Sequence, residues 1–346
     1  MDPAQSQRLQ DDLIHHKTLL EDEVQRNLTQ ESKELLSSLP REKGFMILDH
    51  IYQYQGFWYT ALHVQGVSTF QRRFKAHDSD LLLVTNPKSG ATWLKALAFA
   101  IINRMHLNST TTHQHPLLTK NPHELVPFLE HIYMLDGMFP TDFIINSFAH
   151  PRLFSTHTPY GSLPESVKDS KCKLVYLCRD PTDTVISFWH FTNKLRPKDL
   201  EPNSLEEVFE RFCEGVIEYG PFWDHILGYW KESLESPERV CFLKFEEMKK
   251  EPKVHFRKLA EFLGCPFSME EEETGVIEEM LKLCSFENLS NLEVNKTGKM
   301  PISGFEYNTF FRRGKIGDYV NYLTSGMIER LDQITEEKLH GSGLKF

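Results

Sequence analysis

The chain has 346 residues, of which 40% are hydrophobic and 25% are charged, and its formal net charge is −10. This composition is typical of a soluble globular protein, and so acidic a chain is not expected to present a general nucleic-acid surface. No apolar run approaches the length of a membrane span, the first 30 residues resemble neither a signal nor a transit peptide, and the six scattered cysteines lack metal-ligand spacing. We therefore expect a cytosolic protein with no metal site and no membrane association.

The N-terminal part of the chain is polar, and we expect residues 1–30 to form an extension of one domain that occupies residues 31–346. In this extension the spacing of four apolar residues fits a weak amphipathic helix, and a loosely held tail is the alternative. Those residues are Leu13, Leu19, Leu20 and Val24. Aromatic residues then cluster at positions 52–59. We interpret the cluster as packing in the core or under a lid, and the wall of an apolar substrate pocket is the alternative.

A strand, a tight loop and a helix are expected next. Leu81–Thr85 is short and apolar, as in a strand covered on both faces, and residues 92–104 are apolar on nearly every side, as in a buried helix. Gly90 permits close approach of the backbone, and the first amides of the helix carry partial positive charge. Further donors at this end are Lys88, Ser89 and Thr92. The segment therefore predicts an anion site, most often one for phosphate.

The lysine of this loop precedes its glycine, so the Walker A pattern is absent. An ordinary strand-to-helix turn with a surface lysine is the alternative interpretation. Residues 103–123 are polar and predict a long loop. Its histidines, among them His113, His115 and His123, are expected to be solvated rather than metal-bound, because no carboxylate or thiol completes a site.

Three more strands are expected, at residues 152–156, 173–178 and 240–245, with helices at 182–194 and 254–263. Strands that alternate with helices predict a parallel sheet with right-handed crossovers. No internal repeat or low-complexity linker interrupts the chain, so a single domain is expected.

Three of the expected strands are followed by a polar residue suited to chemistry, namely Lys88, His157 and Arg179. Ligands of open parallel sheets bind beyond the carboxyl ends of the strands, so these residues are predicted to converge on one site. Taken singly, the histidine could be a hydrogen-bonded structural residue and the arginine part of a structural salt bridge. Their joint occurrence favours a site.

The last third of the chain is acidic, and residues 270–273, all glutamate, predict a solvated helix face. Against this background, Arg312, Arg313 and Lys315 flank Gly314. A basic surface loop is one interpretation. The other is a second phosphate clamp, because guanidinium groups bind phosphate oxygens in a bidentate manner.

Three motifs of this chain, in the same order, resemble those of cytosolic sulfotransferases. They are residues 88–93, residues 176–191 and residues 312–318. Residues 39–44 and 121–123 make the resemblance closest to the plant enzymes, and it extends from about residue 31 to the C-terminus. It implies an α/β fold of one domain, with a central parallel sheet flanked by helices and a P-loop-like strand–loop–helix that binds phosphosulfate.

The resemblance also implies an activity. The donor would be 3′-phosphoadenosine 5′-phosphosulfate (PAPS), and its sulfuryl group would pass without a metal to a hydroxyl of a small plant metabolite or hormone. Flavonoids, brassinosteroids, hydroxyjasmonate and desulfoglucosinolates are the acceptor classes of plant relatives. Pocket walls are expected from residues 45–59, 139–148 and 297–309. Four phenylalanines there favour an apolar, ring-containing acceptor, although they could equally belong to the core: Phe139, Phe143, Phe148 and Phe305.

Catalytic and 5′-phosphate roles follow from the matching positions. Lys88 would contact the oxygen that bridges the sulfate and the departing nucleotide, and His157 would be the general base. The loop would cradle the 5′-phosphate through Ser89, Gly90, Ala91 and Thr92. Ala91 stands where the family has threonine, which removes a hydroxyl but keeps the backbone amide.

The rest of the nucleotide is assigned in the same way. Trp93 would face the adenine, Tyr219 would donate a hydrogen bond to it, and Phe286 would stack on it. The 3′-phosphate would be bound by Arg179, Ser187, Arg312, Arg313 and Gly314. Arg313 replaces the usual lysine, and Tyr319 replaces the usual tryptophan. The dimer motif of the animal enzymes is absent before Phe310, so a monomer is expected.

Two other functions stay open at this point. A P-loop-type nucleotide kinase would need Mg²⁺ and a carboxylate to hold it, and no acidic residue ends an expected strand. A non-catalytic nucleotide- or hormone-binding protein on the same scaffold is the other, and Ala91 is the only feature that favours it.

Overall fold

The computed structural model describes residues 24–45, 50–104, 115–135, 141–148, 151–196, 200–300 and 304–346. Within these ranges, no helix combines the length and apolar character that crossing a bilayer requires. The helix expected near Leu13 and Leu20, and the residues His113 and Phe139, lie outside the described residues, as does the side chain of Phe143.

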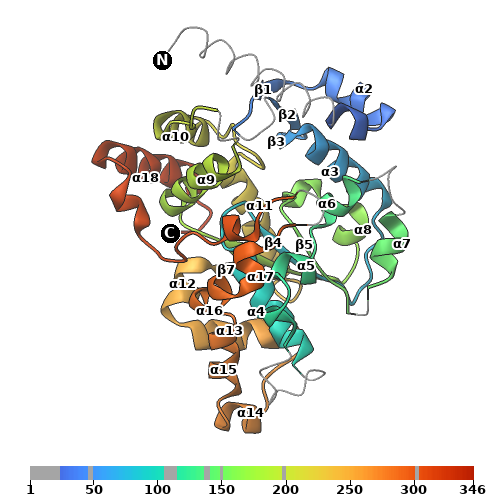
Figure 1. Ribbon diagram of the computed structural model, residues 1–346, viewed down its shortest axis with the longest axis vertical. Helices are drawn as coiled ribbons and strands as arrows, with labels where there is room; N and C mark the ends of the chain where they lie inside the picture. Colours follow the sequence, from blue (N-terminus) through green and yellow to red (C-terminus); the bar gives the residue numbers. More distant parts are fainter. Residues whose placement is uncertain are drawn as a thin grey trace.

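A parallel sheet forms the centre of the molecule (Figure 1). Its strands are β4 (Leu81–Thr85), β5 (Leu153–Thr156), β6 (Lys173–Cys178) and β7 (Val240–Lys244), in the order β5-β4-β6-β7. All neighbouring pairs are parallel, with Leu81 opposite both Leu153 and Lys173. The expected single-domain α/β fold with a parallel sheet is confirmed. The last expected strand ends one residue early, because Phe245 begins a helix.

Side chains of the central strand alternate between two cores. Leu82 and Val84 point into the core that also holds Tyr176, whereas Leu81 and Leu83 point into the opposite core. All five residues of β4 are buried. A strand covered on both faces needs an uninterrupted apolar run, which is why its sequence predicted it so clearly.

Helices cover both faces of this sheet. On one face lie α4 (Ala91–Asn103), α13 (Pro252–Phe262) and α15 (Val276–Leu283). On the other lie α9 (Pro181–Leu195), α11 (Phe222–Glu235) and α18 (Ser325–Leu339). The α9 helix starts where the sequence predicted, because the Asp180 side chain caps the Thr182 N–H and Pro181 occupies the first turn.

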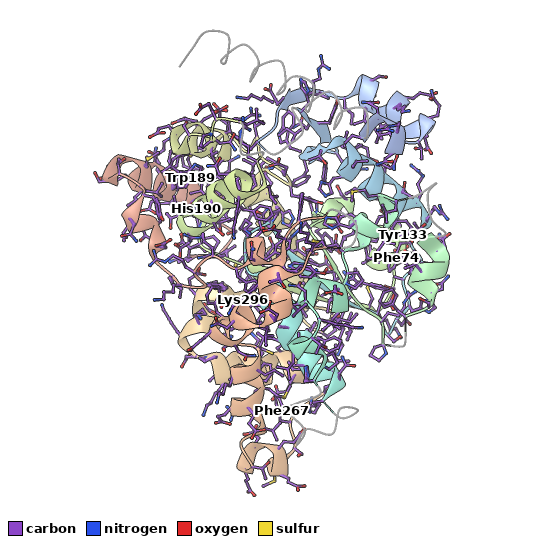
Figure 2. All side chains as sticks on the ribbon, viewed as in Figure 1. Phe74, Tyr133, Trp189, His190, Phe267 and Lys296 are labelled. Atoms are coloured by element: carbon purple, nitrogen blue, oxygen red, sulfur yellow. The ribbon has the colours of Figure 1, made fainter. Side chains whose placement is uncertain are left out.

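Other helices complete the fold. They are α2 (Gln30–Ser38), α3 (Ala61–Arg73), α5 (Pro122–Leu125), α6 (Leu129–Tyr133), α7 (Thr141–Asn146), α8 (Glu165–Lys168), α10 (Leu205–Cys213), α12 (Phe245–Lys250), α14 (Met269–Glu273), α16 (Phe286–Asn291) and α17 (Glu293–Thr297), with 3₁₀ turns at Pro116–Leu118, Tyr160–Ser162, Tyr307–Phe310 and Asp318–Asn321. Phe70 of α3 contacts both Phe74 and Tyr133, which Figure 2 shows on the same side of the molecule. These contacts join α3 to α6. The α14 helix carries the acidic run on a largely exposed surface, as expected.

A small antiparallel sheet lies at the opposite end of the long axis from α14 (Figure 1). It consists of β1 (Arg41–Lys43), β2 (His50–Tyr54) and β3 (Phe57–Thr60). Trp58 and Tyr59 are buried, and the aromatic residues of positions 52–59 do not line the large cavity described below. Core packing is therefore the correct interpretation of this cluster. Residues 24–30 also pack here, through Leu28, and the domain boundary at residue 31 stays a prediction.

A buried ion pair joins the starts of two central strands. Arg152, just before β5, donates from Nε to Asp80 Oδ1 at 2.7 Å, just before β4. The two side chains are 1% and 0% exposed. Asp80 also accepts the His77 N–H at 2.8 Å. Breaking such a pair leaves an uncompensated buried charge.

We expect Asp80→Asn to lower the free energy of unfolding by about 3–5 kcal/mol, because it leaves the Arg152 charge buried without a counter-charge. Urea unfolding followed by circular dichroism measures this. The matched control is Glu210→Gln, which removes an exposed pair with Arg330 and should cost about 0–1 kcal/mol. Equal losses for both variants would contradict the prediction.

Candidate active site

One cavity of about 960 Å³ lies against the carboxyl ends of the parallel strands, and Lys88, His157 and Arg179 all line it. Each follows a different strand: β4, β5 and β6 respectively. The parallel pairing brings these strand ends to one edge. The convergence predicted from the sequence is therefore observed.

The loop between β4 and α4 forms one end of the cavity. Its residues Lys88 and Gly90 have φ values of +70° and +108°. A Cβ on Gly90 would come within 3.0 Å of the Phe245 ring and 3.1 Å of Leu177, so only glycine fits. Because Gly90 is the N-cap of α4 and offers no side-chain cap, the first amides of this helix remain available to an anion.

The remaining residues of the loop differ in their access to this space, because Ser89 is not among the residues that line the cavity. Ala91, Thr92 and Trp93 line the cavity. The Ser89 hydroxyl is buried and has no hydrogen-bond partner among the described residues. Buried polar groups are normally paired, so an unpaired hydroxyl beside free helix amides points to a ligand that accepts hydrogen bonds.

Lys88 lies in strongly positive surroundings. Its Nζ is 3.8 Å from the centroid of the Phe191 ring. Burial, together with the charges of Arg179, Arg312 and Lys194, lowers its pKa to about 7. A bound anion would oppose this shift, because a negative charge favours the protonated amine.

Arg179 links the end of β6 to the C-terminal loop. Its Nη2 donates to the Lys315 carbonyl at 2.9 Å and lies 3.3 Å from Asp183 Oδ2. Asp183 in turn accepts the N–H groups of Gly317 and Tyr319. The Arg179 Nε is buried without a partner in the described part of the chain. This guanidinium is thus fixed in place with one donor unused.

The predicted 3′-phosphate residues gather around it. Ser187, Arg312, Arg313 and Gly314 line the cavity, and both Arg312 and Arg313 bond to the Asp318 carboxylate. A Cβ on Gly314 would come within 2.5 Å of the Phe286 ring. The basic loop therefore belongs to the cavity and is not a separate surface feature.

His157 has a defined tautomer. Its Nδ1 lies 2.6 Å from the Thr85 carbonyl oxygen, and a carbonyl can only accept a hydrogen bond, so Nδ1 carries the proton. The Nε2 lone pair is then free to accept a proton. Its backbone N–H donates to Glu130 Oε1 at 2.6 Å, and its carbonyl accepts from His225 Nε2 at 2.7 Å. Burial lowers the pKa of His157 to about 3, which keeps the ring neutral.

Tyr219 lies beside His157 and not beside the predicted adenine residues. Its ring contacts His157, Tyr59 and His63, and its hydroxyl faces Glu130 Oε1 at 3.4 Å. This position disagrees with the adenine contact expected for Tyr219, because the ring lies against His157, the predicted general base. The sequence assignment rested on the family resemblance and could not test spatial neighbours.

Phe245 takes that place instead, and the sequence analysis missed it. Its ring lies 5.5 Å from that of Trp93 and 4.8 Å from the Arg179 guanidinium carbon. Phe245 directly follows β7. The strand-end argument that found Lys88, His157 and Arg179 did not find it, because that argument looked for polar residues and the expected fourth strand included Phe245.

His123 is also misplaced by the sequence analysis. It was expected in solvent, but it is 7% exposed, with Nε2 at 2.9 Å from Thr92 Oγ1 and Nδ1 at 3.0 Å from Lys95 Nζ. The expected loop is structured here, with Asn121 capping α5. Polar composition predicted the wrong environment because the partners come from α4.

A family model described as the sulfotransferase domain matches residues 78–343. The chain belongs to the sulfotransferase family. Cytosolic sulfotransferase 12 of Arabidopsis thaliana is 51% identical over 320 residues, which are 92% of this chain and 95% of that protein. The resemblance to plant cytosolic sulfotransferases is confirmed, and the chain is a transferase enzyme of this family.

Two solved structures share the fold of this sulfotransferase. An Arabidopsis thaliana protein with a provisional steroid sulphotransferase description is 44% identical, with a TM-score of 0.71, over 90% of this chain and 94% of that one. Retinol dehydratase, in complex with androsterone and the inactive cofactor PAP, is 18% identical, with a TM-score of 0.69, over 92% and 96% of the two chains. The second likeness bears on the fold alone.

The rest of the sulfotransferase cavity, away from the basic residues, is mainly apolar. Leu62, Phe128, Met134, Leu135 and Phe305 line it, whereas Phe148 packs on Phe154 in the core. Two histidines face each other there, with His63 Nε2 at 3.2 Å from His131 Nε2. Among the described residues, no group of three or more histidine, cysteine or acidic side chains could hold a metal ion.

Neutral buried histidines make this sulfotransferase sensitive to acid. Burial lowers the pKa of His225 from 6.5 to about 4. Below pH 6.5 the unfolded chain gains a proton there that the folded chain does not bind until about pH 4. The contribution of His225 to the free energy of unfolding is therefore greatest above pH 6.5, and it decreases progressively as the pH falls towards about 4.

We expect His225→Gln to flatten the pH dependence of stability. Between about pH 4.5 and 6, the slope of the unfolding free energy should decrease by about 1.4 kcal/mol per pH unit, the value of one proton. Urea unfolding at a series of pH values measures it. A slope equal to that of the unaltered protein would contradict the assignment.

Proposed function

We propose that this sulfotransferase uses PAPS to sulfate a hydroxyl of a small apolar plant metabolite or hormone in the cytosol. The observation that carries the proposal is the shared cavity, where the free amides of α4, the basic residues and the His157 Nε2 all face one space. Anion-binding groups at one end and a neutral base near an apolar end fit an anionic donor and an apolar acceptor.

In the proposed reaction, the acceptor oxygen bonds to sulfur as the bond between sulfur and the bridging phosphate oxygen breaks. The acceptor proton passes to His157 Nε2. Negative charge develops on the departing phosphate, and Lys88 is the compact cation suited to stabilise it. Positioning of the two substrates supplies much of the remaining acceleration.

Both phosphates of the donor would orient it: the 5′-phosphate carries the sulfuryl group, whereas the 3′-phosphate lies remote from sulfur. The α4 amides, with Ser89, Gly90, Ala91 and Thr92, would hold the 5′-phosphate. The 3′-phosphate would be held by Arg179, Ser187, Arg312, Arg313 and Gly314. Such remote contacts contribute binding energy that aligns the reacting end. Ala91 lacks the hydroxyl of related enzymes but keeps its amide, so the cradle is retained.

The adenine would lie among aromatic rings. Trp93, Phe245 and Phe286 line the same cavity, and Phe286 packs against Gly314 in the basic loop. We assign these three residues to the adenine and assign Tyr219 to the acceptor side, next to the base. Aromatic faces suit a purine because stacking needs no particular hydrogen-bond pattern.

The acceptor end favours a ring-containing apolar compound with a hydroxyl. Its lining combines apolar side chains with His63, His131 and the base. The provisional steroid description of the Arabidopsis relative suggests a steroid-like acceptor as the first to assay. Flavonoids, hydroxyjasmonate and desulfoglucosinolates complete the panel. We propose a monomer that needs no metal.

We expect His157→Ala to lower kcat by about 10²–10⁴-fold, the usual contribution of a positioned base. Its affinity for 3′-phosphoadenosine 5′-phosphate should be unchanged, because the ring bonds to Thr85 and not to the basic residues. Transfer from labelled PAPS to the four acceptor classes, with and without EDTA, measures the activity. Near-full activity of the variant would remove the base assignment, and loss of sulfuryl transfer in EDTA would contradict the proposal that the reaction needs no metal.

Nucleotide binding is expected to take up a proton at Lys88. Its pKa is about 7 in the free protein, and the added negative charge should raise it. At pH 8 binding of 3′-phosphoadenosine 5′-phosphate should therefore take up about one proton, and at pH 6 much less. Calorimetry in buffers of different ionisation enthalpy measures this. Lys88→Met should abolish the uptake, and an unchanged uptake in that variant would contradict the assignment.

A further inference from the structure

Three side chains form a hydrogen-bonded row behind the phosphate loop. Lys95, on α4 and one turn after the loop, is 0% exposed and does not line the cavity. Its Nζ lies 3.0 Å from His123 Nδ1. On the other side of the ring, His123 Nε2 lies 2.9 Å from Thr92 Oγ1. Thr92 does line the cavity, so the row runs from the interior to the ligand space.

The direction of each bond follows from the groups. In its ammonium form Lys95 has donors and no acceptor, so His123 Nδ1 then accepts from Lys95. The neutral ring then carries its proton on Nε2 and donates to Thr92 Oγ1. Because Thr92 Oγ1 then accepts a hydrogen bond from the ring, the hydrogen of its own hydroxyl group is free to be donated to an anion.

We propose that Lys95 and His123 are positioning residues that fix the Thr92 hydroxyl as a hydrogen-bond donor to the 5′-phosphate of the donor. The inference rests on the proposed PAPS site and adds two residues, of which Lys95 lies behind the cavity wall and His123 lines the cavity beside Thr92. If the ring took the other tautomer, Nε2 would accept from Thr92, and the hydroxyl would be withdrawn from the ligand.

Burying a charged lysine such as Lys95 costs free energy unless its charge is compensated. Among the described residues no carboxylate lies within ion-pair distance of its Nζ, whose other close neighbour is the Phe128 ring, 3.3 Å from the centroid. Burial lowers the Lys95 pKa, while Glu130 opposes the shift. A polyanion bound at the start of α4 would favour the ammonium form. An anionic ligand therefore accounts for a cation that the protein itself does not neutralise.

The imidazole is held so that it cannot easily change partners. Its backbone N–H donates to Asn121 Oδ1 at 2.8 Å. The ring lies 4.4 Å from that of Phe310 and is stacked at 5.6 Å on Phe128. With the ring fixed between two aromatic residues, the identity of its Nδ1 partner decides its tautomer.

The test is a double-mutant cycle in the full-length protein, with 3′-phosphoadenosine 5′-phosphate as the calorimetric probe. Thr92→Val, which removes the hydroxyl but keeps the shape, should weaken binding by about tenfold, the value of one hydrogen bond to a charged group. Lys95→Met should weaken it by a similar factor in the presence of Thr92. In the Thr92→Val background, Lys95→Met should have no further effect.

A second pair of variants examines the ring. His123→Leu should weaken nucleotide binding about tenfold, because no donor then faces Thr92. His123→Gln should retain most of the affinity, since its amide can place an N–H near the position of Nε2. For all folded variants the acceptor KM should change little. Thermal unfolding of each free protein shows whether the variant is folded. If Lys95→Met does not fold, the comparison of His123→Leu with His123→Gln still tests the inference.

Additive losses for Thr92→Val and Lys95→Met would overturn the inference, because they would show that the lysine acts independently of the hydroxyl. Equal affinities of His123→Leu and His123→Gln would also overturn it. Either result leaves the proposed function standing, provided that the unaltered protein binds the nucleotide. An unaltered protein that fails to bind it would overturn the proposed function and this inference together.

Discussion

The hydrogen bond from His157 Nδ1 to the Thr85 carbonyl joins the ends of two neighbouring strands. It can form only because β4 and β5 are parallel and paired with Val84 opposite Thr156. Shifting this register by one residue would turn the imidazole to the other face of the sheet. The same bond fixes the tautomer and leaves Nε2 facing the cavity. The sheet register thus determines the orientation and tautomer of the ring through this contact, whereas burial is the main cause of the low His157 pKa.

Positive charge is concentrated at the other end of the cavity, and part of it lacks an internal counter-charge. Arg312 and Arg313 share the single carboxylate of Asp318, and burial among like charges lowers the Lys88 pKa to about 7. Charges arranged in this way cost free energy in the empty protein. A bound polyanion would offset that cost, which fits the anionic donor that we propose for this acidic chain.

Sequence reasoning succeeded where local pattern and fold topology agree. The apolar run Leu81–Thr85 predicted a buried strand because both of its faces are covered, and Lys88, His157 and Arg179 were found because parallel strands end at one edge. It failed where position depends on a distant partner. His123 looked solvated, yet α4 supplies its partners, Thr92 and Lys95. Residues whose environment is built by remote segments cannot be placed from their neighbours in the chain.

Tyr219 illustrates the same limit at the site. Its sequence flanks suggested the adenine, but β3 pairs with its segment and brings it against Tyr59 and the base. Phe245, which contacts Trp93, was overlooked because this apolar residue was assigned to the end of the strand expected at residues 240–245. The broad outline of the site was therefore predictable, and the division between its two ends was not.

Asp183 ties the basic loop to α9 by accepting the N–H groups of Gly317 and Tyr319. Protein synthesis proceeds from the N-terminus, and early segments can fold before later ones exist. The sheet and the phosphate loop precede residue 245, whereas Arg312, Arg313 and their glycine emerge from the ribosome much later. A nascent chain can therefore form the part of the cavity that holds Lys88, His157 and Arg179 before the basic loop exists. The complete site that we propose for the nucleotide is available only after nearly all of the chain has been made.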